Sequence, residues 1–308
     1  MGGTLQDRTL RYMLSLFGIP CSNNSWLYID EDKQVQSITS QEGFRECMEW
    51  LNMCYEEGIL DQEAISQDSN TVVAKLSEAK VGFFTEYRLT AMGFDAIAED
   101  AVLWVPNAEE TRMRKLFNQA ASCVYVSTTN ENIPATMRWL DAWLDKETMA
   151  SNYLGEKDAA DGGWFYNADG LIEQNPNNSV ASAGATMTYL GNNCFVFAPW
   201  NYYKENFAVG SHITEKSSYD DIYTEAGLFQ TYSNDLMSIA KFDNQTDERR
   251  KLIKADLDTA ITEWIATFVS EGVTDSSWNE FTKVIEDIGM EEFIEIYQTG
   301  LDNLQLAE

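Results

Sequence analysis

The sequence has little of the residue chemistry on which most enzymes depend. It contains a single histidine, His212, and no GxSxG, HExxH, GxGxxG or GxxxxGKS/T motif. A lone histidine without a nearby nucleophile motif is more often incidental than catalytic. The sequence therefore gives no indication of a serine hydrolase, a zinc protease or a phosphate-binding loop.

Basic residues are also scarce. The chain has 21 Lys and Arg against 50 Asp and Glu, which gives a formal net charge of -29. Such a charge repels phosphate backbones and anionic lipid headgroups, so nucleic acid and a bare membrane surface are poor candidate partners. Long apolar runs are missing as well. We therefore expect no transmembrane helix, and the first residues lack the basic region of a secretory signal.

The cysteine pattern gives no signal for two further classes of site, although one pair could still be bridged. The five cysteines are an odd number and none forms a CxxC pair, so neither a zinc site nor a paired disulfide framework is indicated. Cys47 and Cys54 lie on one face of a predicted helix, about 10 Å apart along it, too far for a disulfide. We expect both to be small buried apolar side chains. The acidic turn at residues 30–32 lacks the glycine and closing glutamate of an EF-hand, so we expect no metal and no cofactor.

Apolar periodicity predicts mostly helices with a few short strands. Strand, helix, strand, helix in that order is typical of an α/β fold. In the helix around residue 139, Trp139, Leu140, Trp143 and Leu144 are expected to point inward. The predicted helices cover residues 5–17, 39–58, 71–79, 132–147 and 249–272, with a closing helical pair over 276–303; the predicted strands cover a hairpin at 25–38 and segments 80–84 and 120–129.

Aromatic residues are abundant, and several lie in segments typical of loops. The chain has 9 Trp, 14 Tyr and 15 Phe. Trp26, Trp164 and Trp200 stand beside Asn, Asp or Gly, and a flat aromatic face next to hydrogen-bonding groups suits a sugar ring. Each of these rings could equally be a loop anchor that packs on the core. Paired carboxylates for glycan hydrolysis also stay open, because 50 acidic residues guarantee accidental pairs.

The end of the chain carries a family resemblance. "WNEFTKVIEDIGMEEFIEIYQTGLDN" is similar to the closing signature of extracellular solute-binding protein family 1, in its large oligosaccharide-binding lipoprotein subgroup, with matches at Gly289, Met290, Tyr297, Gln298 and Asp302. Further segments resemble the same subgroup in the same order. These are "FGIPCSNNSW", "YEEGILDQEAISQD", "LSEAKVGFFTEY" and "NIPATMRWLDAWL". The resemblance covers nearly the whole chain.

The resemblance implies a fold. It is the α/β, class II, periplasmic-binding-protein-like fold of two lobes, helix-rich, here with one lobe incomplete. Residues 1–100 and 149–308 would form the larger lobe, and residues 101–148 would hold a hinge crossing and a remnant of the other lobe. The lipoprotein signal and first α/β lobe that usually precede this region are not in the sequence.

The resemblance also implies a function without catalysis. We expect the substrate-binding component of an ABC importer, a monomer that holds an oligosaccharide between its lobes and delivers it to the membrane permease. The full-length protein would be extracellular and anchored as a lipoprotein. Tyr87 matches a stacking aromatic of the family, Glu86 could bind hydroxyls, and Trp164, Trp26 and Trp200 are further candidates. A glycan hydrolase and a truncated lobe without a working cleft are the alternatives.

Overall fold

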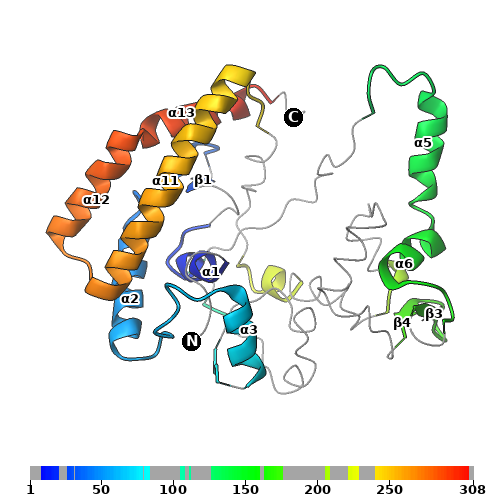
Figure 1. The fold of residues 1–308 in the computed structure, drawn as a ribbon, viewed down its shortest axis with the longest axis horizontal. Helices are drawn as coiled ribbons and strands as arrows, with labels where there is room; N and C mark the ends of the chain where they lie inside the picture. Colours follow the sequence, from blue (N-terminus) through cyan, green and yellow to red (C-terminus); the bar gives the residue numbers. More distant parts are fainter. Residues whose placement is uncertain are drawn as a thin grey trace. The chain divides into compact units, whose positions relative to one another are not determined.

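A computed structural model describes about two thirds of the chain as two compact units (Figure 1). Unit 1 comprises Met1–Glu86, Trp104–Phe117 and Tyr223–Glu308, and unit 2 comprises Tyr87–Leu103 and Asn118–Ile222. The structure describes residues 8–20, 26–30, 32–78, 80–83, 105–107, 111, 126–159, 163–175, 205–208, 221–228 and 240–304.

The predicted lobes have other bounds than these units. Units are defined by contacts, whereas lobes are defined by movement about a hinge. The division into residues 1–100 with 149–308, and residues 101–148, therefore stays a prediction.

Unit 1 is a helical assembly with one short hairpin. α11 packs against α2, α12 and α13, and α13 also contacts β2. β1 and β2 pair antiparallel, with Tyr28 opposite Gln36, as the predicted hairpin requires. The helices predicted for this unit are all present. The helices and strands of unit 1 whose bounds the structure describes are α1 (Arg8–Leu16), β1 (Leu27–Ile29), β2 (Val35–Ser37), α2 (Glu42–Glu56), α3 (Ser69–Ser77), α11 (Asn244–Glu271), α12 (Asp275–Ile288) and α13 (Met290–Asp302).

The longest helix, α11, has clear start and stop signals. The Asp243 carboxylate caps its start by accepting from the Thr246 backbone N–H at 2.9 Å and from the Thr246 hydroxyl at 2.9 Å. Gly272 ends it with φ +87°, a conformation that favours glycine. The apolar residues that α11 buries recur at about four-residue spacing, which keeps them on one face. They are Ile253, Leu257, Ile261, Ile265, Phe268 and Val269.

The Asp243 cap gives a pH-dependent prediction. The hydrogen bonds from Thr246 lower the pKa of Asp243 from its ordinary 3.8, so its stabilisation is complete above that pH and is lost as the pH falls through the folded-state pKa. We expect Asp243→Ala to lower the melting temperature, by an amount that shrinks below about pH 4. Thermal melts between neutral and acid pH test this. Asp256→Ala, at an exposed position of the same helix, is the control; an equal and pH-independent loss in both variants would contradict the prediction.

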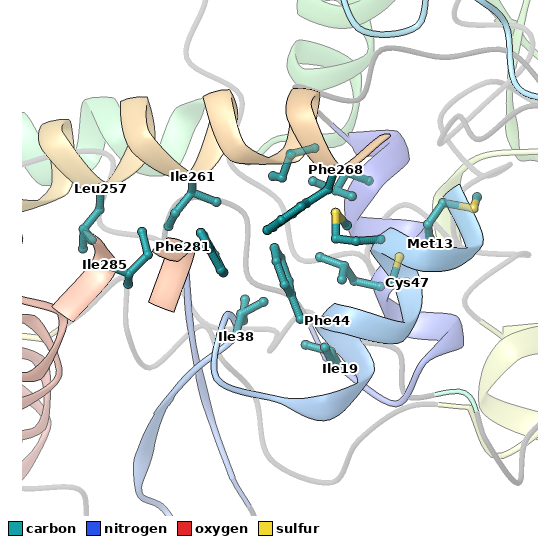
Figure 2. Packing of buried hydrophobic residues seen from close by; sticks show 14 of the residues in the cluster. Met13, Ile19, Ile38, Phe44, Cys47, Leu257, Ile261, Phe268, Phe281 and Ile285 are labelled. Carbon is teal, nitrogen blue, oxygen red and sulfur yellow. The ribbon is translucent and has the colours of Figure 1, made fainter. Parts of the chain in front are cut away.

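Aromatic rings from three helices form the centre of the unit 1 core (Figure 2). Phe281 stacks on Phe44 with centroids 5.9 Å apart and meets Phe268 edge-on at 5.3 Å. Figure 2 shows Cys47 in the same cluster, on the side of Met13. Cys47 and Cys54 are both buried, which confirms the prediction of small buried apolar side chains. Burial raises the pKa of the Cys54 thiol.

The closing signature has a structural explanation. Gly289 adopts φ +113° between α12 and α13, which permits the sharp junction of the two helices. The Tyr297 hydroxyl accepts from Arg250 Nη1 at 2.9 Å. Gln298 Oε1 accepts from the Val35 backbone N–H at 2.8 Å, and its Nε2 donates to Asp302 Oδ1 at 2.9 Å. These signature residues therefore fasten α13 to α11 and to the β1–β2 hairpin.

Gly43 allows α2 to approach the end of α1. A Cβ at Gly43 would lie 2.3 Å from the Phe17 carbonyl oxygen, a backbone atom that cannot rotate away. We expect Gly43→Ala to lower the free energy of unfolding by about 1–3 kcal/mol, because overpacking outweighs the gain in helix propensity. Urea unfolding measures the change. The control is Gly82→Ala, whose Cβ would meet nothing within 4 Å; a Gly43→Ala variant as stable as this control would refute the close approach.

Unit 2 contains two consecutive helices and a second hairpin. The Asp145 carboxylate caps α6 by accepting from the Thr148 N–H at 3.0 Å. β3 and β4 pair antiparallel, with Phe165 opposite Glu173. A small core joins α6 to the hairpin through Met149, Ala150, Leu154, Trp164, Ile172 and Phe207. The helices and strands of unit 2 whose bounds the structure describes are α5 (Ile133–Ala142), α6 (Lys146–Leu154), β3 (Trp164–Tyr166) and β4 (Ile172–Gln174).

Two local predictions are wrong where the structure describes them. Residues 80–83 form no strand, and Phe83 is 36% exposed. The Lys80 N–H donates instead to the Lys75 carbonyl at the end of α3. Trp139 on α5 and Leu144 just beyond its end are 49% and 45% exposed rather than inward, because periodicity shows which residues share a face but not what covers it. Most of segment 120–129 lies outside the described residues.

Candidate functional site

Trp164, a predicted stacking residue, is fully buried. Its side chain is 0% exposed and lies in the small core of unit 2. The indole Nε1 donates to Ser151 Oγ at 3.2 Å, so its polar atom is also satisfied inside the unit. A ring without exposed surface offers no face to a sugar. The burial favours the interpretation of Trp164 as a loop anchor.

The loop before Trp164 is held tightly by backbone geometry. The Asp158 N–H donates to the Trp164 carbonyl at 2.8 Å. Gly163 has φ +76°, and a Cβ there would lie 1.7 Å from the Glu156 carbonyl oxygen. Gly155, with φ +93°, ends α6 on the other side of the loop. The loop therefore folds back on β3 and fixes the position of Trp164.

The neighbour of Trp164 is Tyr166, a half-buried residue with charged groups around its ring. The two rings meet edge-on, with centroids 5.3 Å apart. Lys146 Nζ and Lys157 Nζ lie 5.0 Å and 4.7 Å from the Tyr166 centroid, within the range of cation–π contacts. Glu147 accepts from Lys157 Nζ at 2.8 Å. We call Lys146, Glu147, Lys157 and Tyr166 the Tyr166 cluster.

The charges of the Tyr166 cluster support one another. The hydrogen bond to Glu147 raises the pKa of Lys157, and the same bond lowers the pKa of Glu147. Burial, followed by the Glu147 charge, raises the pKa of Tyr166. The sequence analysis missed this cluster. The alternation of strand "WFY" puts Trp164 and Tyr166 on one face, but the lysines arrive from α6 and the following loop.

Trp26 belongs to unit 1 and is half buried against its core. Its Nε1 donates to Asp258 Oδ1 at 3.0 Å, and Lys254 Nζ donates to the other oxygen of the same carboxylate. The polar atom of the indole is thus occupied by α11. The ring is anchored, and part of its face stays accessible.

Tyr87, Glu86 and Trp200 lie outside the described residues, as does His212. Their proposed ligand contacts stay predictions. The structure does bring Trp164 together with groups suited to orienting a polar ligand, namely the Tyr166 cluster. Trp26 and Trp164 are described each within its own unit.

A polar hollow of about 280 Å³ lies beside the end of α2. Lys75 lines the hollow, and its Nζ donates to Asp61 Oδ2 at 2.7 Å and to Glu63 Oε2 at 2.6 Å. Burial acts to raise the pKa of Asp61, but the hydrogen bond from Lys75 and that from the Glu63 N–H outweigh it, and the pKa is lowered. None of the described residues that line the hollow is aromatic. Its lining residues are Gly58, Ile59, Asp61, Lys75, Lys80 and Val81.

In the acidic turn of the first hairpin, both carboxylate oxygens of Asp30 accept hydrogen bonds from residues of the same hairpin. Asp30 Oδ1 accepts from the N–H groups of Asp32 and Gln34, and Asp30 Oδ2 accepts from Gln36 Nε2. Within the described ranges, no group of three His, Cys, Asp or Glu side chains is close enough to hold a metal ion. In the same part of the chain, no helix combines the length and apolarity that crossing a membrane demands.

The chain is similar to known proteins in both sequence and structure. The chain is 22% identical over 322 residues to the fructooligosaccharide ABC transporter substrate-binding protein FusA of Streptococcus pneumoniae. The solved structure of a FusA EF-hand mutant in complex with fructo-nystose matches with a TM-score of 0.69 and 18% identity, over 99% of this chain. A solute-binding protein associated with an HMO-binding ABC transporter of Bifidobacterium longum infantis matches with a TM-score of 0.65, at 12% identity over 94% of this chain.

The chain has the fold of the solute-binding proteins. The resemblance stated from the motifs is confirmed, because FusA is homologous over 97% of this chain. The periplasmic-binding-protein-like fold and its helix-rich character are confirmed as well. No family model matches the chain.

The match covers only part of these relatives. The chain spans 56% of the length of FusA, 62% of the chain in its solved structure and 61% of the Bifidobacterium protein.

Proposed function

We propose that the chain belongs to the substrate-binding component of an ABC importer and binds an oligosaccharide. The observation that carries this proposal is the similarity to FusA along 97% of the chain. Two structures of FusA with sugars, one with fructo-nystose and one with kestose, match this fold. The protein delivers its ligand to a membrane permease. It acts outside the cell as a monomer, with a lipid anchor in the full-length protein.

The pKa values of the described carboxyl groups bear on the hydrolase alternative. A glycan hydrolase needs one carboxylic acid whose pKa is raised, so that it can protonate the leaving oxygen. Every described carboxyl group with a shifted pKa has it lowered, which favours the ionised form. These groups are Asp61, Glu78, Asp145, Glu147, Asp243, Asp247 and Glu292. None of these seven described groups therefore has the raised pKa of a general acid.

The first experiment is a thermal-shift titration of the chain with kestose and nystose. A ligand that binds only the folded state raises the melting temperature by mass action. At a free ligand concentration of 100 times Kd, the folded state is stabilised by about 2.7 kcal/mol. We expect a saturable rise, and no new reducing ends after prolonged incubation. Release of fructose would favour the hydrolase. Absence of a shift with these and a wider set of oligosaccharides would favour the alternative of a chain without a working cleft.

Tyr87 is the proposed stacking residue, with Glu86 as a hydroxyl-binding neighbour and Trp26 and Trp200 as further contacts. We expect Tyr87→Ala to cost about 1–3 kcal/mol of binding free energy, the value of one buried aromatic contact. By affinity arithmetic this is roughly a 5- to 150-fold higher Kd in calorimetry. Tyr87→Phe keeps the ring and should bind nearly as well. Equal affinity of the alanine variant and the unmodified chain would remove Tyr87 from the site.

A further inference from the structure

The β1–β2 hairpin has an outer face that combines an aromatic ring with polar groups. Leu27 and Ile29 point into the core of unit 1 and are 0% and 1% exposed. Because side chains alternate along a strand, Tyr28 points to the other face, and Gln36 lies directly opposite it on β2. Both side chains are half-buried, so part of each is accessible. We call Tyr28, Gln36 and Asp30, which follows Tyr28 by two positions, the hairpin face.

Hydrogen bonds hold the Gln36 amide in one orientation. Its Nε2 donates to Asp30 Oδ2 at 2.8 Å. Asp30 is itself held by the turn, because its Oδ1 accepts from the N–H groups of Asp32 and Gln34 at 3.0 Å and 2.8 Å. A backbone N–H of β2 also donates to Gln298 Oε1 at 2.8 Å, which ties the hairpin to α13. Groups fixed in this way lose little freedom when a ligand binds to them.

Three polar groups of the hairpin face have no hydrogen-bond partner among the residues that the structure describes. They are the Tyr28 hydroxyl, Gln36 Oε1 and the second N–H of Gln36 Nε2. Burial, followed by the Asp30 charge, raises the pKa of Tyr28 above its ordinary 10.0, so the hydroxyl keeps its proton at neutral pH. The face therefore offers hydrogen-bond donors and an acceptor beside a flat ring. A sugar has an apolar C–H face next to hydroxyls that donate and accept, and it fits this set.

We propose that the hairpin face is a subsite for one neutral sugar unit of the oligosaccharide. The Tyr28 ring stacks on the C–H face of the sugar, and the Gln36 amide donates to one hydroxyl and accepts from the next. Asp30 is a positioning residue, because it sets which way the amide faces. Its carboxylate also repels an anionic unit such as a uronate. The inference rests on the proposed function, since it names contacts of the oligosaccharide proposed there.

Trp26, already among the proposed contacts, is close to this subsite. It precedes Tyr28 by two residues, so the two Cα atoms are at most about 7 Å apart. Its Nε1 donates to Asp258 Oδ1 at 3.0 Å, which holds the ring while part of it stays accessible. An oligosaccharide, with its successive rings, can therefore touch both aromatic residues. The subsite and Trp26 belong to unit 1 alone.

Calorimetry of the chain with kestose and nystose tests the two contacts. Gln36→Leu keeps the bulk of the side chain and removes its amide, and Tyr28→Leu keeps apolar packing and removes the flat ring. We expect the Kd to rise about fivefold in the first variant and about tenfold in the second. Gln245→Leu, at an exposed position of α11, is the control and should bind as the unmodified chain does. Hydrogen exchange of peptides from residues 26–38 checks that the hairpin is intact in each variant.

Asp30→Asn tests the positioning role. Asn167 stands at the same place in the β3–β4 hairpin, where its Oδ1 accepts from two backbone N–H groups at 3.0 Å each, so asparagine should preserve the turn. The asparagine Nδ2 cannot accept from Gln36, whose amide must turn round, and we expect the Kd to rise about threefold. In the Gln36→Leu background the same change should add no further loss, because no amide is left to orient. Asp32→Asn, the same change of charge at the tip of the turn, should leave the Kd unchanged.

The outcomes separate this inference from the proposed function. If the unmodified chain binds the sugars and Gln36→Leu binds them equally well, the subsite is overturned and the proposed function stands. Should Tyr28→Leu open the hairpin in the exchange experiment, Tyr28→Phe with unchanged exchange replaces it and must keep nearly full affinity. An equal loss from Asp30→Asn in both backgrounds would contradict the positioning role. No binding by the unmodified chain would overturn the proposed function and the subsite together.

Discussion

Replacing Phe281 by alanine is expected to lower the free energy of unfolding of unit 1 by about 3–5 kcal/mol, the usual cost of emptying a buried phenylalanine site. Phe281 is 1% exposed and lies where α2, α11 and α12 meet. Its ring touches those of Phe44, Phe268 and Trp278, with centroids between 5.3 and 5.9 Å away. These neighbours come from separate helices, so a cavity there cannot close without moving a helix axis.

The readout must be specific to unit 1. Hydrogen exchange of α11 and α12 peptides, followed by mass spectrometry, reports the opening free energy of this region rather than of the whole chain. The matched control is Leu252→Ala on the exposed side of α11, where the side chain is 63% exposed and a change within about 0.5 kcal/mol is expected. If Phe281→Ala accelerated exchange no more than Leu252→Ala, the aromatic cluster would not be the centre of the core.

Much of unit 1 could be predicted from the sequence because local signals and packing agree there. The stripe of α2 and the stop at Gly272 after α11 follow from periodicity and backbone geometry. The hairpin follows from alternation around a polar turn. The closing signature predicted a family, and the structure explains it through contacts of Tyr297 and Gln298 that no local pattern reveals.

Unit 2 was harder to predict, since its features depend on which elements meet. The pattern of α5 indicates a stripe but says nothing about what covers it. In unit 1 the same limit applies to the predicted strand at 80–84, whose described residues 80–83 form no strand. The Tyr166 cluster is made by lysines from two other segments, and such contacts leave no mark at fixed sequence spacing.

A tryptophan beside glycine and aspartate can be a binding platform or a core residue, and composition does not separate the two. Trp26 and Trp164 look alike in the sequence, yet Trp164 is 0% exposed whereas Trp26 keeps part of its ring accessible. The difference arises from β3, which turns Trp164 towards the small core of unit 2. Exposure, not residue type, therefore decides which aromatic residues are available to a ligand.

Trp164→Ala is expected to destabilise unit 2 by about 3–5 kcal/mol, because the indole is the largest of the described side chains in the small core. Trp164→Phe is the matched control: it keeps most of the apolar volume, loses the bond to Ser151 Oγ, and should cost about 1–2 kcal/mol. Hydrogen exchange of peptides from α6 and the β3–β4 hairpin measures both changes, and calorimetry with kestose measures affinity in the same samples. If Trp164 is an anchor, the alanine variant is the least stable, the phenylalanine variant is intermediate and the unmodified chain is the most stable. A stacking residue would instead leave the exchange of unit 2 unchanged and lose sugar affinity in the alanine variant alone, and that outcome would return Trp164 to the ligand site.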